Sequence, residues 1–84
     1  MTMTRISRND WNKVKAYEEL TGAIVKVEGG RWIIDAPEEM DAYDTTADLM
    51  EFINYELTEA RGQHITDGSF EEYRAICQAA GMEV

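Results

Sequence analysis

The stretch AIVKVEGGRWIIDA, residues 23–36, decides the fold. Its two halves are rich in β-branched residues and flank Gly29-Gly30, whose glycines tolerate the positive φ angles of a two-residue hairpin turn. The turn pairs Glu28 with Arg31, Val27 with Trp32, Lys26 with Ile33, Val25 with Ile34 and Ile24 with Asp35. In this register one face carries only the apolar residues Ala23, Val25, Val27, Trp32, Ile34 and Ala36. A slip of one residue would mix the two faces, so the sequence predicts an antiparallel hairpin with a single register.

A lone hairpin is marginally stable in water, so other elements must cover it. Three segments have the apolar spacing of helices, and each follows a Ser or Thr with an acidic residue three positions later, a pattern typical of helix N-termini. These segments are about residues 8–20 after Ser7 with Asp10, about 46–61 after Thr45 with Asp48, and about 70–80 after Ser69 with Glu72. Gly22, Gly62 and Gly81 follow them and suit the position just beyond a helix C-terminus.

The remaining segments are expected to be irregular. Pro37 ends the second strand because it cannot donate to the sheet, and residues 38–44 form an acidic connector. Residues 63–68 are expected to form a turn-rich loop, and residues 1–6 either a loose tail or a short third strand. The predicted order is α-β-β-α-α in a single α+β domain spanning residues 1–84, with the hairpin packed against helices.

Acidic residues dominate the middle of the chain. The formal net charge is −9, and no Lys or Arg occurs between Asp35 and Glu59. Such a chain repels nucleic-acid phosphates and anionic membranes, but it attracts a basic protein surface. The basic residues near the N-terminus are explained by ion pairs along the first helix rather than by contact with nucleic acid. We therefore expect a protein partner with a basic surface, no nucleic-acid binding and no membrane contact; the alternative is that the charge serves only solubility.

The sequence contains no catalytic or metal-binding motif. Asp41 and Asp44 lack the spacing and the glycine of an EF-hand loop, and one His with one Cys cannot form a structural zinc site. His64 and Cys77 have no orienting acid or oxyanion hole nearby in the sequence. We therefore expect no enzymatic activity, no cofactor and no metal. The single cysteine and the absence of a secretory signal predict a cytoplasmic protein.

The acidic helix is the main candidate for a binding site. On a helical wheel, one sector contains Leu49, Met50, Ile53, Leu57 and Ala60. Carboxylates three residues apart on the opposite side lie about 5–6 Å apart, a spacing comparable to that of phosphates along a nucleic-acid strand. The predicted partner-binding residues are Asp48, Glu51, Phe52, Tyr55, Glu56 and Glu59, with Glu38, Glu39, Asp41, Tyr43 and Asp44 as further candidates. The alternative is that Phe52 and Tyr55 pack against the hairpin or the first helix.

In length, net charge, lone cysteine and the row of carboxylates from Asp35 to Glu59, the chain resembles the small acidic inhibitors that phages and mobile elements make against restriction and CRISPR enzymes. This resemblance is compositional and matches no motif. It implies a DNA-mimicking viral inhibitor that binds, without turnover, a basic nucleic-acid-binding surface of a larger protein, such as a host-defence nuclease complex. A phage-encoded protein of this kind would act in the host-cell cytoplasm.

Two other functions remain open from the sequence. The chain is either a monomer or a homodimer, and a homodimeric regulatory or adapter module would pair through the mixed face of the hairpin, where Ile24 and Ile33 supply apolar contacts. A small enzyme using His64 or Cys77 is the third alternative.

Overall fold

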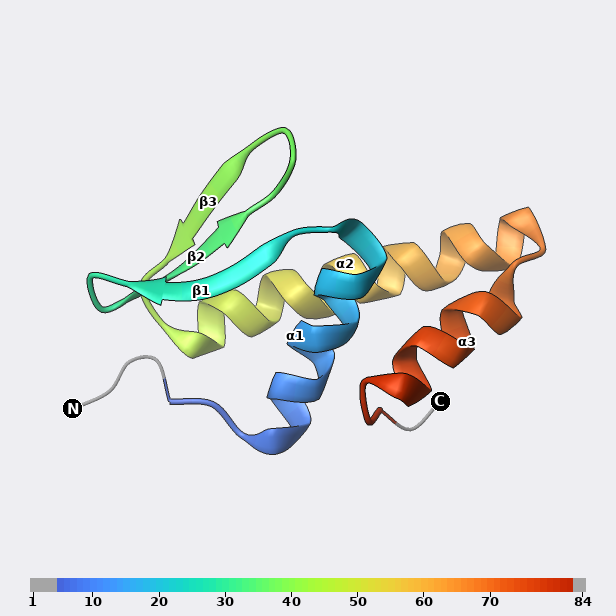
Figure 1. Ribbon diagram of the computed structural model, residues 1–84, viewed down its shortest axis with the longest axis horizontal. Helices are drawn as coiled ribbons and strands as arrows, with labels where there is room; N and C mark the ends of the chain where they lie inside the picture. The colour runs from blue at the N-terminus through green and yellow to red at the C-terminus, as the bar shows by residue number, and fades with distance from the viewer. Residues whose placement is uncertain (1–4, 83–84) are drawn as a thin grey trace.

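The computed structural model describes residues 5–82 and confirms an α+β domain (Figure 1). Its elements are α1 (Arg8–Thr21), β1 (Ile24–Glu28), β2 (Arg31–Asp35), β3 (Met40–Tyr43), α2 (Thr46–Asp67) and α3 (Phe70–Ala79). The strands form one antiparallel sheet in the order β1-β2-β3. The domain is elongated, with principal extents of 42 × 27 × 17 Å.

The hairpin of β1 and β2 has the predicted register at all five pairs, from Ile24–Asp35 to Glu28–Arg31. Gly29 and Gly30 have φ angles of 63° and 78°, so both occupy the left-handed region that a type I′ turn requires. On the apolar face, Ala23, Val25, Trp32 and Ile34 are buried. Val27 is 48% exposed because it lies near the turn on an edge strand.

A third strand replaces the predicted connector. Met40–Tyr43 pairs with β2, Tyr43 facing Trp32 and Met40 facing Asp35. Pro37 lies in the tight connection, which is closed by a hydrogen bond from Ala36 N–H to Glu39 C=O (2.9 Å). The order is therefore α-β-β-β-α-α, and the added strand lies at residues 40–43. The alternative prediction for residues 1–6 falls mostly on residues 1–4, which lie outside the described residues; Arg5 and Ile6 form no strand.

The caps of α1 and α2 are as predicted, but the end of α2 is not. Ser7 Oγ accepts from Asp10 N–H and Thr45 Oγ1 accepts from Asp48 N–H, both at 3.1 Å. Helix α2 continues through Gly62 to Asp67, so the predicted stop at Gly62 and the predicted loop at 63–68 are wrong. A mid-helix glycine costs only about 1 kcal/mol, which packing of the last turns of α2 against α3 offsets.

Helix α2 ends instead at Asp67, and Gly68 caps it with φ 76°. The hydroxyl of Ser69 makes no cap bond to the start of α3 and contacts His64 Nδ1 at 2.8 Å, so the predicted capping box with Glu72 is wrong. Gly81 follows α3, as predicted, with φ 94°.

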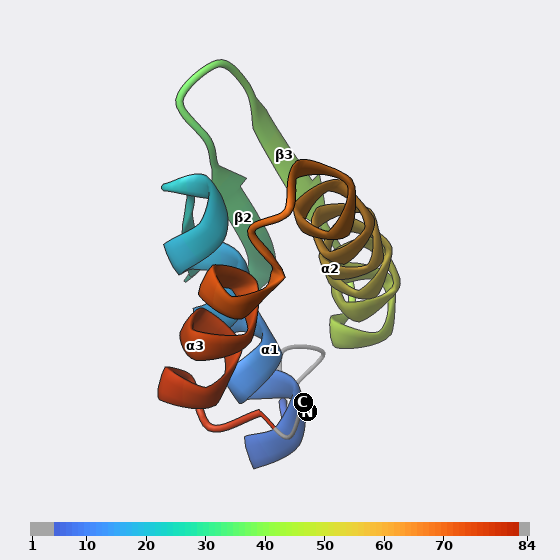
Figure 2. The same cartoon turned by 90° about the vertical axis from the view of Figure 1, so that its right-hand side faces the viewer.

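The core lies between the inner face of the sheet and the helices. α1 packs against β1, α2 lies beside β3, and α3 packs against α1 and α2 at the other end of the molecule (Figures 1 and 2). The buried residues are Val14, Ala16, Tyr17, Ala23, Val25, Trp32, Ile34, Leu49, Met50, Ile53, Leu57, Tyr73 and Cys77. Across residues 5–82, no helix is both long and apolar enough to cross a membrane.

Candidate protein-binding site

A shallow depression lies between β3 and the first half of α2. It has a volume of about 610 Å³ and is lined by Ala42, Tyr43, Asp44, Asp48, Glu51, Phe52 and Tyr55. Six of these seven residues are among the predicted partner-binding residues, and Ala42 is the exception. We call this feature the α2–β3 depression.

Two polar contacts fix α2 against the sheet. The indole N–H of Trp32, in the central strand, donates to Thr46 Oγ1 in the first turn of α2 (2.9 Å). Arg31 Nε donates to Asp44 Oδ1 (2.6 Å), an ion pair just before the helix. These contacts hold one wall of the depression at a defined distance from the other.

Phe52 and Tyr55 have different roles in this wall. Phe52 is half-buried, with its ring stacked on Tyr43 (centroids 5.5 Å apart) and edge-to-face with Tyr17 (5.8 Å). Tyr55 is 61% exposed. The packing alternative therefore holds for Phe52, although part of its ring still lines the depression, whereas Tyr55 is available to a partner.

The carboxylates of α2 do not form one uniform row. Asp48, Glu51 and Glu59 are exposed, and they take part in no ion pair within residues 5–82. Glu56 is half-buried at the border of the core, near Tyr17 and Tyr43. Successive residues of a helix are rotated by about 100°, so Glu56 points about 100° away from Tyr55, towards the sector that contains Leu57 and faces the core.

These carboxylates also affect the pKa values of two neighbouring tyrosines. Burial, and next the Glu56 carboxylate, raise the pKa of Tyr17. Burial, and next the carboxylates of Asp41 and Glu56, raise the pKa of Tyr43. Negative charge therefore extends from the exposed side of α2 to the inner side of β3.

The five further candidate residues divide between two places. Tyr43 and Asp44 line the depression, but the charge of Asp44 is already paired with Arg31. Asp41 is half-buried on the inner side of β3, the same side as Tyr43. Glu38 and Glu39 lie beyond the Asp35–Met40 pair, at the opposite end of the sheet from the Trp32–Tyr43 pair that adjoins α2. The carboxylates from Asp35 to Glu59 thus belong to separate surfaces.

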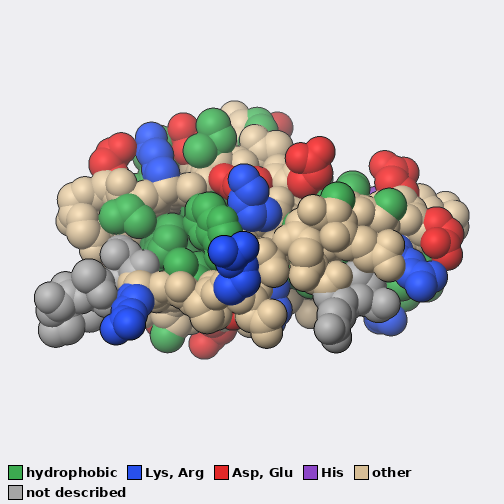
Figure 3. Space-filling view, turned by 60° about the horizontal axis from the view of Figure 1, so that its bottom comes forward, with side chains coloured by type: hydrophobic (Ala, Val, Ile, Leu, Met, Phe, Trp, Pro, Cys, Tyr) green, Lys and Arg blue, Asp and Glu red, His purple; other side chains and the backbone are tan. Residues whose placement is uncertain are grey.

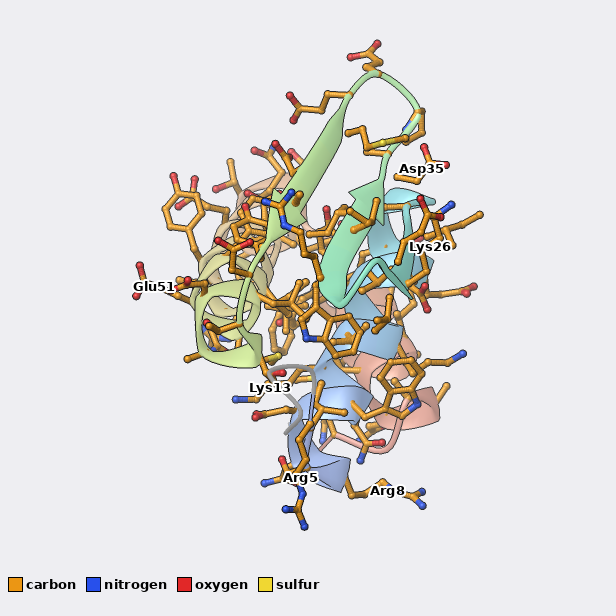
Figure 4. All side chains as sticks on the ribbon, turned by 90° about the vertical axis from the view of Figure 1, so that its left-hand side faces the viewer. Arg5, Arg8, Lys13, Lys26, Asp35 and Glu51 are labelled. Carbon is orange, nitrogen blue, oxygen red and sulfur yellow. The ribbon has the colours of Figure 1, made fainter. Side chains whose placement is uncertain are left out.

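Positive and negative side chains are partly segregated. Figure 4 shows Arg5 and Arg8 at the start of α1, at the far end of the molecule from the β2–β3 connection, while Glu51 projects from α2 away from them. On the face shown in Figure 3, Lys and Arg side chains occur over the middle and towards both ends, while most Asp and Glu side chains lie along the upper and right-hand edges. The α2–β3 depression itself contains no Lys or Arg among its lining residues.

The residues considered for catalysis lie elsewhere. The ring of His64 lies tilted by 42° against that of Tyr73, with centroids 5.6 Å apart, and Cys77 is fully buried in the core. Burial raises the pKa of the Cys77 thiol, which disfavours the thiolate needed for nucleophilic attack. Within residues 5–82, no three His, Cys, Asp or Glu side chains are placed to hold a metal ion together. None of the protein families, curated proteins and solved structures compared with the chain matches it.

Proposed function

We propose that the protein is a non-enzymatic acidic inhibitor that binds, through the α2–β3 depression, a basic and ordinarily nucleic-acid-binding surface of a larger protein in the cytoplasm. The observation that carries this proposal is the combination of an aromatic side chain, Tyr55, left 61% exposed, with the unpaired carboxylates of Asp48 and Glu51 on the same concave surface. Tyrosine is enriched at interface hot spots because it adds a large contact area with little loss of conformational entropy. The adjacent carboxylates favour a cationic partner and steer its approach.

The size of the molecule is compatible with such a role. Its accessible surface is 5549 Å². A standard interface buries about 800 Å² on each partner, which would occupy roughly one seventh of this surface. The molecule therefore has room for one such interface, which would extend beyond the depression onto the surrounding surface.

The test compares two triple variants with the same change in net charge. The first, Asp48→Asn with Glu51→Gln and Glu59→Gln, neutralises the exposed side of α2; the control, Glu19→Gln with Glu71→Gln and Glu72→Gln, neutralises exposed carboxylates on α1 and α3. The partner is first captured from a lysate of the source cells by the wild-type protein and identified by mass spectrometry. Its affinity for the wild type and for both variants is then measured at low and high salt.

The first variant is expected to bind about 3- to 150-fold more weakly, since an exposed ion pair contributes about 0.2–1 kcal/mol. Its affinity should also depend less on salt, because fewer charges remain to be screened. The control should bind nearly as well as the wild type. Equal losses in both variants would show that only total charge matters, and no loss in the first would refute the proposed surface.

A second candidate function is a homodimeric module, favoured by the outer face of the sheet. Ile24 and Met40 are 58% and 64% exposed there, on either side of Asp35, and Ile33 lies in the neighbouring row between Lys26 and Ala42. Light scattering distinguishes the two functions: a dimeric mass that persists at high salt and becomes monomeric on Ile24→Lys would support the dimer. A monomeric mass at all concentrations would eliminate it.

A further inference from the structure

The outer edge of β3 has free backbone groups. In a two-residue hairpin the residues beside the turn form a hydrogen-bonded pair. The backbone N–H and C=O groups of Arg31 and Ile33 therefore point towards β1, and those of Trp32 and Ile34 point towards β3. Trp32 and Ile34 pair with Tyr43 and Asp41, so the intervening Met40 and Ala42 direct their N–H and C=O groups away from the sheet.

No hydrogen bond in the described part of the chain uses these outward groups. Both residues are exposed. The edge of β3 can therefore pair with another extended chain.

The opposite edge of the sheet is different. On β1 the outward N–H of Val25 donates to Glu18 Oε2 at 2.7 Å, so a side chain of α1 occupies that edge. Of the two edges, only that of β3 is left without such a contact within residues 5–82.

The free edge borders the α2–β3 depression. Ala42 belongs to both features, and the depression continues from it to Phe52 and Tyr55 on α2. A strand added beside β3 would lie about 4.8 Å farther out, over this part of α2. Its alternate side chains would enter the depression, and the others would extend the outer face of the sheet.

We propose that β3 receives an extended segment of the partner protein as a fourth strand, and that this segment carries Lys or Arg at alternate positions. This inference rests on the proposed function and names its mode of binding. Met40 and Ala42 each supply one donor and one acceptor, giving about four backbone hydrogen bonds to the segment. Its inward cations meet the unpaired carboxylates of Asp48 and Glu51, and an inward apolar side chain packs on Tyr55.

Asp41 adds to the preference for a basic segment. Its carboxylate is half-buried on the inner side of β3, with no ion-pair partner within residues 5–82. A cation on the added strand beside Asp41 forms a favourable cross-strand pair. A second copy of this chain is a poor occupant, because antiparallel pairing of two β3 strands would bring two Asp41 carboxylates and two acidic α2 surfaces together.

The experiment selects peptides from a displayed library of random peptides of about 12 residues on the immobilised wild-type protein. Selected peptides are then measured against Ala42→Pro, which removes the outward N–H and blocks pairing while proline remains tolerable on an edge strand. The matched control is Ala42→Thr, which keeps the N–H and favours extended backbone. Circular dichroism and thermal unfolding establish that both variants are folded.

The expected peptides carry two or more Lys or Arg residues at alternate positions, bind Ala42→Pro at least about tenfold more weakly than wild type, and bind Ala42→Thr within about twofold. As a measurement independent of the proline variant, peptide binding should slow hydrogen exchange at the Met40 and Ala42 amides of the wild-type protein. Unchanged exchange there, or equal affinity for Ala42→Pro, would overturn strand addition.

The outcomes separate this inference from the proposed function. Peptides that ignore Ala42→Pro but lose affinity on the triple substitution of Asp48, Glu51 and Glu59 would leave an acidic binding surface without strand addition. Failure to select basic peptides would overturn strand addition by a basic segment, whereas the proposed function is decided by the affinity of the captured partner for the two triple variants. A wild-type dimer that Ala42→Pro converts to monomer would assign the edge to a second copy and overturn the proposed occupant.

Discussion

Substitution of Phe52 by Leu tests whether this aromatic residue supports the site from within the fold. Leucine keeps most of the apolar side chain but removes the ring that contacts Tyr17 and Tyr43 at centroid distances of 5.8 and 5.5 Å. An aromatic pair contributes about 0.5–1.5 kcal/mol beyond burial of its area, so losing two pairs lowers the free energy of unfolding by about 1–3 kcal/mol. A domain of this size has only about 4–13 kcal/mol of stability, so the effect is readily measured.

The assay is urea unfolding followed by tryptophan fluorescence, to which Trp32, 4% exposed in the folded protein, and the half-buried Trp11 both contribute. The midpoint should move to lower urea with an unchanged slope, and the melting temperature should fall by roughly 4–8 °C for each kcal/mol lost. The control is Tyr55→Leu, which changes an exposed ring on the same helix and should shift the free energy by less than about 0.5 kcal/mol. A loss below about 0.5 kcal/mol in Phe52→Leu, or an equal loss in Tyr55→Leu, would refute this division of roles.

Three further predictions concern stability and reactivity. Burial, and next the Cys77 thiol, raise the pKa of Tyr73 from 10.0 to about 12. Because the folded state holds the phenolic proton more tightly, the free energy of unfolding is highest below pH 10 and falls by up to about 2.7 kcal/mol as the pH rises to 12. Denaturant titrations across this pH range should show a much smaller fall in Tyr73→Phe. Gly29→Asn should raise the free energy of unfolding by about 0.4–1 kcal/mol in the same assay, since asparagine tolerates the φ of 63° and restricts the unfolded chain, and a loss of stability would contradict the type I′ turn. Cys77 is fully buried, so it should react with a thiol reagent only as fast as the protein opens. Its position would be contradicted if, without denaturant, the rate increased in proportion to reagent concentration and matched that of a free thiol.

The hairpin could be predicted from sequence because its determinants are local. Gly29-Gly30 defines the turn, and alternation on both sides defines the register, so every pair from Ile24–Asp35 to Glu28–Arg31 is correct. The starts of α1 and α2 could also be predicted from the sequence, because their capping side chains accept hydrogen bonds from backbone amides only three positions away. Such signals do not depend on the rest of the fold.

The third strand and the true end of α2 depend on tertiary contacts. The sequence MDAY at residues 40–43 has little β-branched character, and it becomes a strand because β2 offers an edge and because Tyr43 stacks on Phe52. Gly62 resembles a helix terminator, yet α2 continues to Asp67 because α3 packs against it. Local patterns carry no information about either neighbour.

The binding site was only partly predictable for the same reason. The helical wheel identified Asp48, Glu51 and Tyr55 on the exposed side of α2. It misplaced Glu56, which borders the core, and it gave no indication of Ala42, whose importance comes from its backbone position at the edge of a strand that the sequence did not predict.

The contact between Glu18 and Val25 has a consequence for behaviour at high concentration. A sheet whose two edge strands are both unpaired can bind another copy of the protein at each edge, and repeated pairing of this kind produces fibrils of indefinite length. Here the hydrogen bond from Val25 N–H to the Glu18 carboxylate occupies a donor on one side, so a chain added at that side would first have to displace Glu18. Glu18→Ala would restore the second joining point, and fibril formation by this variant, under conditions in which the wild-type protein stays dispersed, is the expected result.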